Sequence, residues 1–194
     1  MGHSRAEKVL THQKIVTIAA RRFREVGLEG ISVADIMSEA GLTVGGFYRH
    51  FETREALVVE ALTQAFADLD SWEEVARSNL GEAIRSYLSE GHRDDLPRSC
   101  ALTSLVNDVS RSNEATREVF NQRLTRMLGL IEGLISTDMK SNRKEKAIVL
   151  LSACVGSLAL SRAVPNPEFS RSILRSTANE LIEMYCASNT THKS

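Results

Sequence analysis

The chain has 194 residues, of which 42% are hydrophobic, and its formal net charge is only -1 at pH 7. This length suits one large domain, or a small domain joined to a larger one, with enough apolar residues for a core. The charge excludes a polycation that would bind nucleic acid through its overall charge.

The three cysteines, Cys100, Cys154 and Cys186, are an odd number and are widely spaced. They argue against a disulfide framework and a zinc site, and for a reducing cytoplasmic location without metal or cofactor. The N-terminus has no apolar stretch of the kind found in secretory signals. No run reaches 18 apolar residues, so we expect no membrane span. The richest stretch, AIVLLSACVGSLALSRAV, is interpreted as a buried helix.

Apolar residues follow helical spacing along almost the whole chain, and no sustained alternation indicates a strand. We therefore predict an all-α fold with a helix-turn-helix domain over residues 1–55 and a larger helical domain over 56–194. The first helix should end before Gly27, and Ser32, Thr43 and Thr53 should cap the next three helices, the last of which reaches Leu69. The later helices are expected around 80–88, 102–109, 120–135, 147–164 and 169–187, with Pro97, Pro165 and Pro167 between helices.

Two short helices joined by EAGLT have the layout of a helix-turn-helix, with Gly41 in the turn. In that motif the second helix enters the major groove and its N-terminal residues face base edges. A glycine inside a helix costs about 1 kcal/mol relative to alanine, but it lets the backbone come close to DNA. The residues expected at the base edges are Thr43, Val44, Gly45 and Gly46.

A dense run of aromatic and basic residues follows the two glycines. Phe47 and Phe51 lie four residues apart and should anchor the short helix to its neighbours. Helix N-termini offer free N–H groups and a positive dipole end to phosphates, and a cation in a first turn is favourable only if an anion lies opposite. The expected phosphate contacts are Ser32, Tyr48, Arg49, His50, Thr53 and Arg54. Since the same shape and aromatic runs also occur in proteins that bind no DNA, a helical protein-interaction module stays open as an alternative.

The segment AARRFREVGLEGISVADIMSEAGLTVGGFYRHFETREAL resembles the DNA-binding domain of the TetR family of bacterial transcriptional regulators. The resemblance runs from about Gln13 to Leu57 and implies an all-helical homodimer with a C-terminal ligand-binding domain. It places base and phosphate contacts on Ser32, Thr43, Gly45, Gly46, Tyr48, Arg49, His50 and Arg54, although the family often has lysine at the position of Arg54. The implied function is a repressor that binds a near-palindromic operator in double-stranded DNA and is released by a small-molecule effector.

The helices of the second domain should surround a cavity, a common place for a small-molecule site in a helical bundle. The candidate lining residues are Phe66, Trp72, Tyr87, Cys100, Leu105 and Met127. The same residues can equally be ordinary core. Cys100, expected in a first helical turn capped by Ser99, could also be a reactive thiol that senses electrophiles or oxidants, because the helix dipole and Arg98 favour thiolate.

The last two predicted helices carry small residues on one and apolar residues on the other, which suits close packing in a four-helix interface between two copies. The expected interface residues are Ala153, Gly156, Ser157, Leu174, Leu181, Ile182 and Tyr185. We expect no enzyme, because no nucleophile–base pair or carboxylate constellation is apparent and HRDD lacks the other parts of a kinase.

Overall fold

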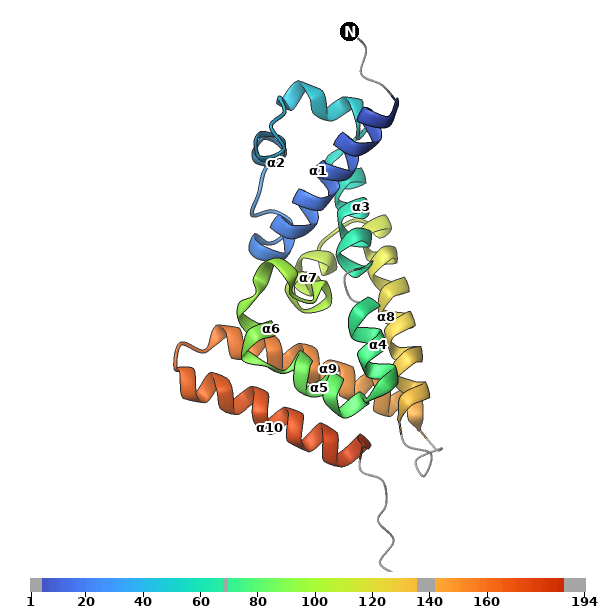
Figure 1. The fold of residues 1–194 in the computed structure, drawn as a ribbon, viewed down its shortest axis with the longest axis vertical. Coiled ribbons are helices and arrows are strands. Elements are labelled where there is room, and N and C mark those ends of the chain that lie inside the picture. Colours follow the sequence, from blue (N-terminus) through green and yellow to red (C-terminus); the bar gives the residue numbers. More distant parts are fainter. Residues whose placement is uncertain (1–4, 68–69, 136–141, 187–194) are drawn as a thin grey trace, which may run out of the picture. The chain divides into compact units, whose positions relative to one another are not determined.

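The computed structural model describes residues 5–67, 70–135 and 142–186. Every regular element in these ranges is a helix, so the predicted all-α fold is confirmed (Figure 1). The α-helices are α1 (Arg5–Val26), α2 (Val33–Glu39), α3 (Arg54–Ala67), α4 (Asp70–Ser78), α5 (Leu80–Tyr87), α6 (Glu90–Asp94), α7 (Ala101–Ser110), α8 (Glu114–Leu134), α9 (Arg143–Ala163) and α10 (Pro167–Cys186), and the 3₁₀-helices are η1 (Val44–Arg49) and η2 (Leu96–Arg98).

Local signals set the helix ends of the N-terminal segment. Gly27 and Gly41 adopt left-handed backbone conformations, with φ of 83° and 76°, which end α1 and form the turn after α2. Ser32 caps α2 and forms a capping box with Asp35, in which each side chain bonds the other residue's backbone N–H at 3.2 Å. The Thr53 hydroxyl accepts a hydrogen bond from the Ala56 N–H, also at 3.2 Å. These predicted stops and caps are confirmed.

The chain divides into two compact units, and each is discontinuous in sequence. Unit 1 comprises residues 1–69 and 96–123, and unit 2 comprises residues 70–95 and 124–194. The expected domain boundary after residue 55 falls in the first turn of α3, so it does not coincide with this division. That boundary stays a prediction about which residues read DNA.

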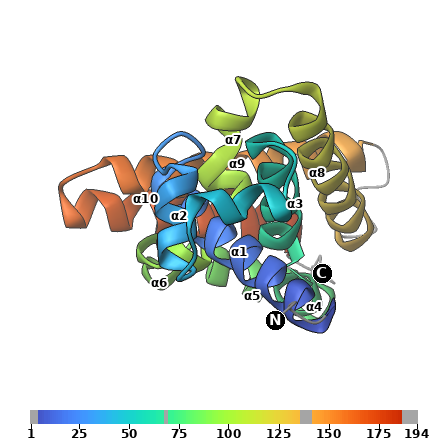
Figure 2. The ribbon, with the colours of Figure 1, turned by 90° about the horizontal axis from the view of Figure 1, so that it is seen from above.

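In unit 1, α1 lies between α2 and α3 in both views (Figures 1 and 2). Phe23 of α1 and Leu57 of α3 are almost completely buried, and Ile36 and Met37 carry the apolar face of α2. The helix α7 packs against α1 and α3. This frame holds η1 at one end of α2, where the turn is only a few residues long.

In unit 2, α9 and α10 form a helical hairpin, and α5 packs on α10 (Figure 1). The hydroxyls of Ser157 and Thr177 lie 2.9 Å apart across the hairpin. The Arg162 guanidinium on α9 donates to the carbonyls of His92 and Arg93 at 3.2 and 3.0 Å, which holds α6 against α9.

Five expectations about the helices are corrected. Pro97 was expected between helices but lies in the 3₁₀-helix η2, and the helix expected from residue 120 begins at Glu114. Pro167 was expected between helices, but it is the first residue of α10, where its missing N–H would be unpaired in any case. The helix expected from residue 147 begins at Arg143. The predicted cap of α7 is also wrong, because Cys100 rather than Ser99 is the N-cap residue. Leu69 and Ala187, which we expected in helices, lie outside the described residues.

By length and composition alone, α9 is long and apolar enough to cross a membrane, and no other described helix is. Its best 18-residue window has a mean hydropathy of 1.5, and a third of that window is buried. A core helix can be equally long and apolar. Contacts with α10 and α6 cover part of α9, and the sequence-based interpretation of this stretch as a buried helix stays a prediction.

Candidate nucleic-acid interface

The segment that follows the Gly41 turn is a 3₁₀-helix, η1, and not an α-helix. Thr43 is its N-cap residue, as predicted, but the Thr43 hydroxyl makes no capping hydrogen bond and is exposed. In a 3₁₀-helix residues three apart lie one above the other. Gly45 therefore lies in the same row as Tyr48, and the backbone beside the tyrosine ring is bare.

No contact among the described residues requires glycine at positions 45 and 46, the second and third residues of η1. A Cβ added at Gly45 would meet no atom within 4 Å, and one added at Gly46 would meet Met37 Cε at 3.6 Å, an ordinary contact. Neither residue has a positive φ, unlike Gly27 and Gly41. The cost of these glycines therefore has no counterpart among the contacts of the described residues.

Exposed side chains surround this bare backbone. Tyr48 is 74% exposed and Val44 is 49% exposed, which is unusual for residues of this size. Thr43 and Arg49 are exposed as well, and His50 is half-buried. The helix therefore presents a hydroxyl, a phenol and a guanidinium around a glycine surface, and these groups can bond to base edges and phosphate oxygens.

Two buried rings fix the position of η1, as the sequence predicts. Phe47 and Phe51 are 1% and 3% exposed and stack on each other with centroids 5.3 Å apart. Phe51 also stacks on the ring of His12 in α1 at 4.5 Å, and His12 Nε2 lies 2.6 Å from a Glu60 carboxylate oxygen in α3. The buried side of η1 is therefore linked to α1 and, through His12, to α3, which fixes the direction of its exposed side.

His50 ends η1 next to several positive groups. Burial is the largest cause that lowers the pKa of His50, and the charges of His12, Lys8 and Arg49 act in the same direction. Its Nδ1 atom is buried and has no hydrogen-bond partner within the described part of the chain. A phosphate placed beside this ring would favour its charged form.

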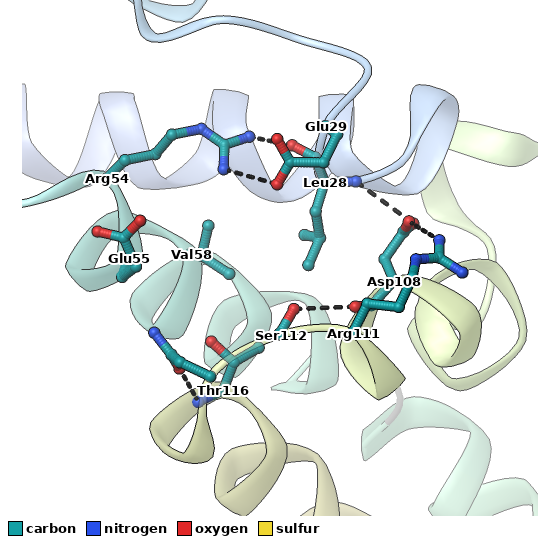
Figure 3. A pocket seen from close by; sticks show the side chains of 10 residues that line it. Leu28, Glu29, Arg54, Glu55, Val58, Asp108, Arg111, Ser112 and Thr116 are labelled. Carbon is teal, nitrogen blue, oxygen red and sulfur yellow. Dashed lines mark hydrogen bonds and ion pairs between the residues drawn. The ribbon is translucent and has the colours of Figure 1, made fainter.

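Arg54 does not point into open solvent, although we expected it to contact phosphate. Its guanidinium lies 3.1 Å from Glu29 and also hydrogen-bonds to the Leu28 carbonyl, in the loop between α1 and α2 (Figure 3). Its side chain is 26% exposed, and it lies 6.0 Å from the centroid of the Phe23 ring. In this structure Arg54 holds the α1–α2 loop on α3. Lys14, another basic residue of this region, likewise donates to the Ala40 carbonyl at 2.8 Å.

A second contact on the same loop comes from α7 and has no signal in the sequence. Asp108 Oδ2 accepts a hydrogen bond from the Leu28 N–H at 3.4 Å, and Asp108 Oδ1 accepts one from Arg111 at 2.9 Å (Figure 3). These groups border a pocket of about 470 Å³ whose walls also include Val58, Ser112 and Thr116. The loop that leads to α2 is therefore held from both α3 and α7.

The six expected ligand-binding residues do not come together in one described cavity. Phe66, Cys100 and Leu105 belong to unit 1, and Trp72, Tyr87 and Met127 belong to unit 2. All are buried except Trp72, which is half-buried and donates from Nε1 to the Ala83 carbonyl at 3.0 Å. Phe66 packs against the Phe120 ring, and Trp72 against the Tyr87 ring. These contacts are those of ordinary core residues, and a ligand role for the six stays a prediction.

Cys100 is only 1% exposed, and its side chain makes no capping hydrogen bond at the start of α7. An alkylating agent or oxidant needs access to the sulfur, so this placement does not favour a sensing thiol at the lip of a cavity. Among the described residues, no group of three or more His, Cys, Asp or Glu side chains could hold a metal ion.

Most of the expected interface residues on α10 face the interior of their own chain. Leu174, Leu181 and Tyr185 are 2%, 4% and 5% exposed, and Ser157 on α9 is 9% exposed. As placed, they provide little surface to a partner, and their role in a dimer interface stays a prediction. The remaining three, Ala153, Gly156 and Ile182, are half-buried.

A different set of apolar residues on α9 and α10 is exposed. On α9, Val149 and Leu160 are 54% and 60% exposed, and they lie on the side that carries Ala153 and Gly156. On α10, Phe169 and Met184 are 59% and 56% exposed. Sequence reasoning missed these four, although the helical spacing of Val149 and Leu160, seven and four residues from Gly156, was an available signal on α9.

Residues 15–61 match the family model described as bacterial regulatory proteins, tetR family. The HTH-type transcriptional repressor KstR2 of Rhodococcus jostii is 37% identical over 68 residues, which are 34% of this chain and 33% of that protein. The HTH-type transcriptional repressor DhaR of a Mycobacterium species is 39% identical over 57 residues, 29% of each chain. The chain thus aligns with about a third of the length of these curated relatives.

Solved structures resemble nearly the whole chain in fold. A TetR-family transcriptional regulator from Cytophaga hutchinsonii gives a TM-score of 0.76 at 19% identity, over 97% of this chain and 100% of that chain. The reduced form of NemR from E. coli gives a TM-score of 0.75 at 16% identity, over 93% and 99%. At such identities the likeness concerns the fold, an N-terminal helix-turn-helix followed by a C-terminal helical region.

Proposed function

Because the chain belongs to the TetR family of bacterial regulatory proteins, we propose that it is a transcriptional repressor that binds a near-palindromic operator as a homodimer. The observation that carries this proposal is the surface of η1. Two glycines that the fold does not require are surrounded by exposed Thr43, Tyr48 and Arg49. The curated relatives KstR2 and DhaR are named as repressors, which supports the same direction of regulation.

In this proposal η1 lies in the major groove, with Thr43, Val44, Gly45 and Gly46 at base edges. Tyr48, Arg49 and His50 bind phosphates, together with the helix starts at Ser32 and Thr53. Phosphate contacts dominate the affinity of such proteins, so binding should weaken steeply as salt is raised. The role of Arg54 is to hold the α1–α2 loop so that α2 and η1 keep their position, since its guanidinium is bonded to Leu28 and Glu29.

The proposed dimer surface is the exposed apolar side of the α9–α10 hairpin. Val149, Ala153, Gly156 and Leu160 lie on one side of α9, and Phe169 and Met184 are exposed on α10. Several large exposed apolar residues on one helical hairpin favour a protein–protein contact. A dimer supplies two copies of η1, and it sets the distance between half-sites at about one turn of DNA or a multiple of it.

We further propose that a small-molecule effector releases the repressor from DNA, and that the protein acts in the cytoplasm, where the operator is. The test is a mobility-shift titration with DNA from upstream of its own gene, repeated with a scrambled DNA of equal length. The expected result is specific retardation that weakens as salt is raised. Absence of retardation with either DNA would instead favour the alternative, a helical protein-interaction module without DNA binding.

A further inference from the structure

A groove of about 380 Å³ lies on unit 2 between α10 and the segment that joins α5 to α6. The helices α5 and α10 lie side by side there (Figure 1). None of the residues that line this groove was among the expected ligand-binding residues. One of them, Leu174, was expected in the dimer interface. The volume of the groove is within the range of small-molecule pockets.

Positive charge is concentrated in this groove. Arg85 comes from α5, and Arg171 and Arg175 come from successive turns of α10. Among the described residues that line the groove, Glu90 is the only acidic one. Its carboxylate lies 3.8 Å from Arg171 and is shared with Arg93, which lies at 3.4 Å. The three arginines therefore exceed the available negative charge, and an anion in the groove would relieve their mutual repulsion.

The base of the groove is apolar. Leu88, Leu174 and Ala178 line it and are 5%, 2% and 5% exposed, so their side chains belong to the core and leave only a small apolar area at the base. Guanidinium groups at the rim and an apolar base suit a molecule with two chemically different ends. The planar guanidinium of arginine binds carboxylate and phosphate groups through two parallel hydrogen bonds.

The groove lies on the side of α10 opposite to its exposed apolar residues. At about 100° per residue, Phe169, Ile173 and Met184 fall on one side of the helix, and Arg171, Arg175 and Ala178 fall on the other. A partner that covers the first side therefore leaves the groove open. Ligand binding in the groove and pairing of two chains through the apolar side are compatible.

We propose that this groove binds a small organic anion that consists of a carboxylate or phosphate group joined to an apolar group. The anionic group is held by Arg171 and Arg175, with Arg85 opposite, and the apolar group lies on Leu88 and Leu174. The site is separate from η1, and the inference does not depend on whether the protein binds DNA.

The test is calorimetric titration of the full-length protein, without DNA, with octanoate, octyl phosphate, inorganic phosphate and octylammonium. We expect saturable binding of octanoate or octyl phosphate at one site per chain, at least tenfold weaker binding of inorganic phosphate, and no binding of octylammonium. Octanoate and octyl phosphate distinguish a carboxylate from a phosphate ligand. The double variant Arg171→Gln/Arg175→Gln should bind the preferred anion at least tenfold more weakly, with an unchanged circular dichroism spectrum.

The control is Arg77→Gln, which removes one exposed arginine of unit 2 outside the groove and should bind as the wild type does. If the double variant does not fold, Arg85→Gln on α5 tests the same site from the other wall. Wild-type affinity in the folded groove variants, or equal affinity for octylammonium, would overturn the proposal. Binding of an acidic peptide but of neither octyl anion would overturn it as well, in favour of a protein partner.

Discussion

The backbone N–H of Leu28 donates to the carboxylate of Asp108, 80 residues further along the chain, in a long hydrogen bond of 3.4 Å (Figure 3). The carbonyl of the same residue accepts a hydrogen bond from Arg54. The turn before it is close to the same carboxylate, since a Cβ on Gly27 would lie 3.0 Å from Asp108 Oδ2. One residue of the α1–α2 loop is thus bonded to two helices of unit 1, and α7 can influence the segment that positions α2 and η1.

The first prediction concerns Asp108→Ala, which leaves the Leu28 N–H without its acceptor. The loss of such a hydrogen bond costs about 1 kcal/mol of unfolding free energy, and urea titration measures it. Amide exchange at Leu28 should become faster at the same time. Arg111→Gln is the control, because it removes an ion pair whose arginine side chain is 70% exposed and keeps the carboxylate; it should change stability by a few tenths of a kcal/mol. Equal losses in both variants would assign the effect to the ion pair.

The caps and stops of the N-terminal helices could be predicted from the sequence because their signals are local. Ser32 with Asp35 and the left-handed Gly27 and Gly41 act within one turn of their own position. The contact of Asp108 with Leu28 could not be predicted, because it joins distant residues and leaves no periodic pattern.

The faces of α10 were ambiguous for a related reason. Leu174 and Leu181 follow helical spacing, and such spacing identifies a buried side without saying whether its own chain or a partner covers it. The structure shows that its own chain covers them. The opposite side, with Phe169 and Met184, is interrupted by the polar residues Ser176 and Glu180, so it did not appear as an apolar face.

The second prediction separates the effect of Gly45 on stability from its effect on DNA binding. Gly45→Ala should raise the unfolding free energy by about 0.4–1 kcal/mol, because alanine fits the open space and restricts the unfolded chain. It should nevertheless weaken operator binding, because the added methyl group stands between the backbone and DNA. The control is Gly129→Ala in α8, which has equally open space and should gain stability without change in DNA affinity. Thermal unfolding measures the stability, and fluorescence anisotropy measures the DNA affinity. Undiminished DNA affinity in Gly45→Ala would show that DNA does not approach the backbone closely at Gly45.

The third prediction distinguishes a phosphate contact from a residue that holds a loop. Arg49→Ala should weaken DNA binding and lower the slope of log affinity against log salt by about 1, since one phosphate contact is lost. Arg54→Ala should weaken binding through movement of the α1–α2 loop, with the slope unchanged, because its guanidinium is bonded to Leu28 and Glu29. A lower slope in Arg54→Ala would mean that this guanidinium leaves the loop for a phosphate in the complex.

The fourth prediction tests the proposed dimer surface at Gly156. A Cβ at this position meets no atom within 4 Å inside the chain, so Gly156→Leu should fold normally instead of overfilling the contact of α9 with α10. If two α9–α10 hairpins pack at this face, the leucine should shift the protein toward monomer in sedimentation and weaken operator binding. Gly129→Leu, at another open glycine, serves as the control. A full dimer in Gly156→Leu would exclude this face as the interface.

The fifth prediction concerns the pH dependence of stability and rests on His92. Its Nδ1 lies 2.7 Å from the Tyr87 carbonyl and must carry the proton, because a carbonyl can only accept. Burial is the largest cause that lowers the pKa of His92, and the charge of Arg162 acts in the same direction, while the bond to Tyr87 and the charge of Asp95 oppose them. The unfolded chain therefore takes up a proton at a higher pH than the folded chain does.

It follows that this contribution to stability is present above the ordinary histidine pKa of about 6.5 and is lost as the pH falls below it. Urea titrations between pH 5 and 8 should show unfolding free energy decreasing toward acid, by at most about 1.4 kcal/mol per pH unit for one proton. His92→Gln should flatten this dependence. The part that remains should decrease further in His50→Gln, because the pKa of His50 is also lowered, mainly by burial. A His92→Gln profile as steep as that of the wild type would show that another group controls acid unfolding.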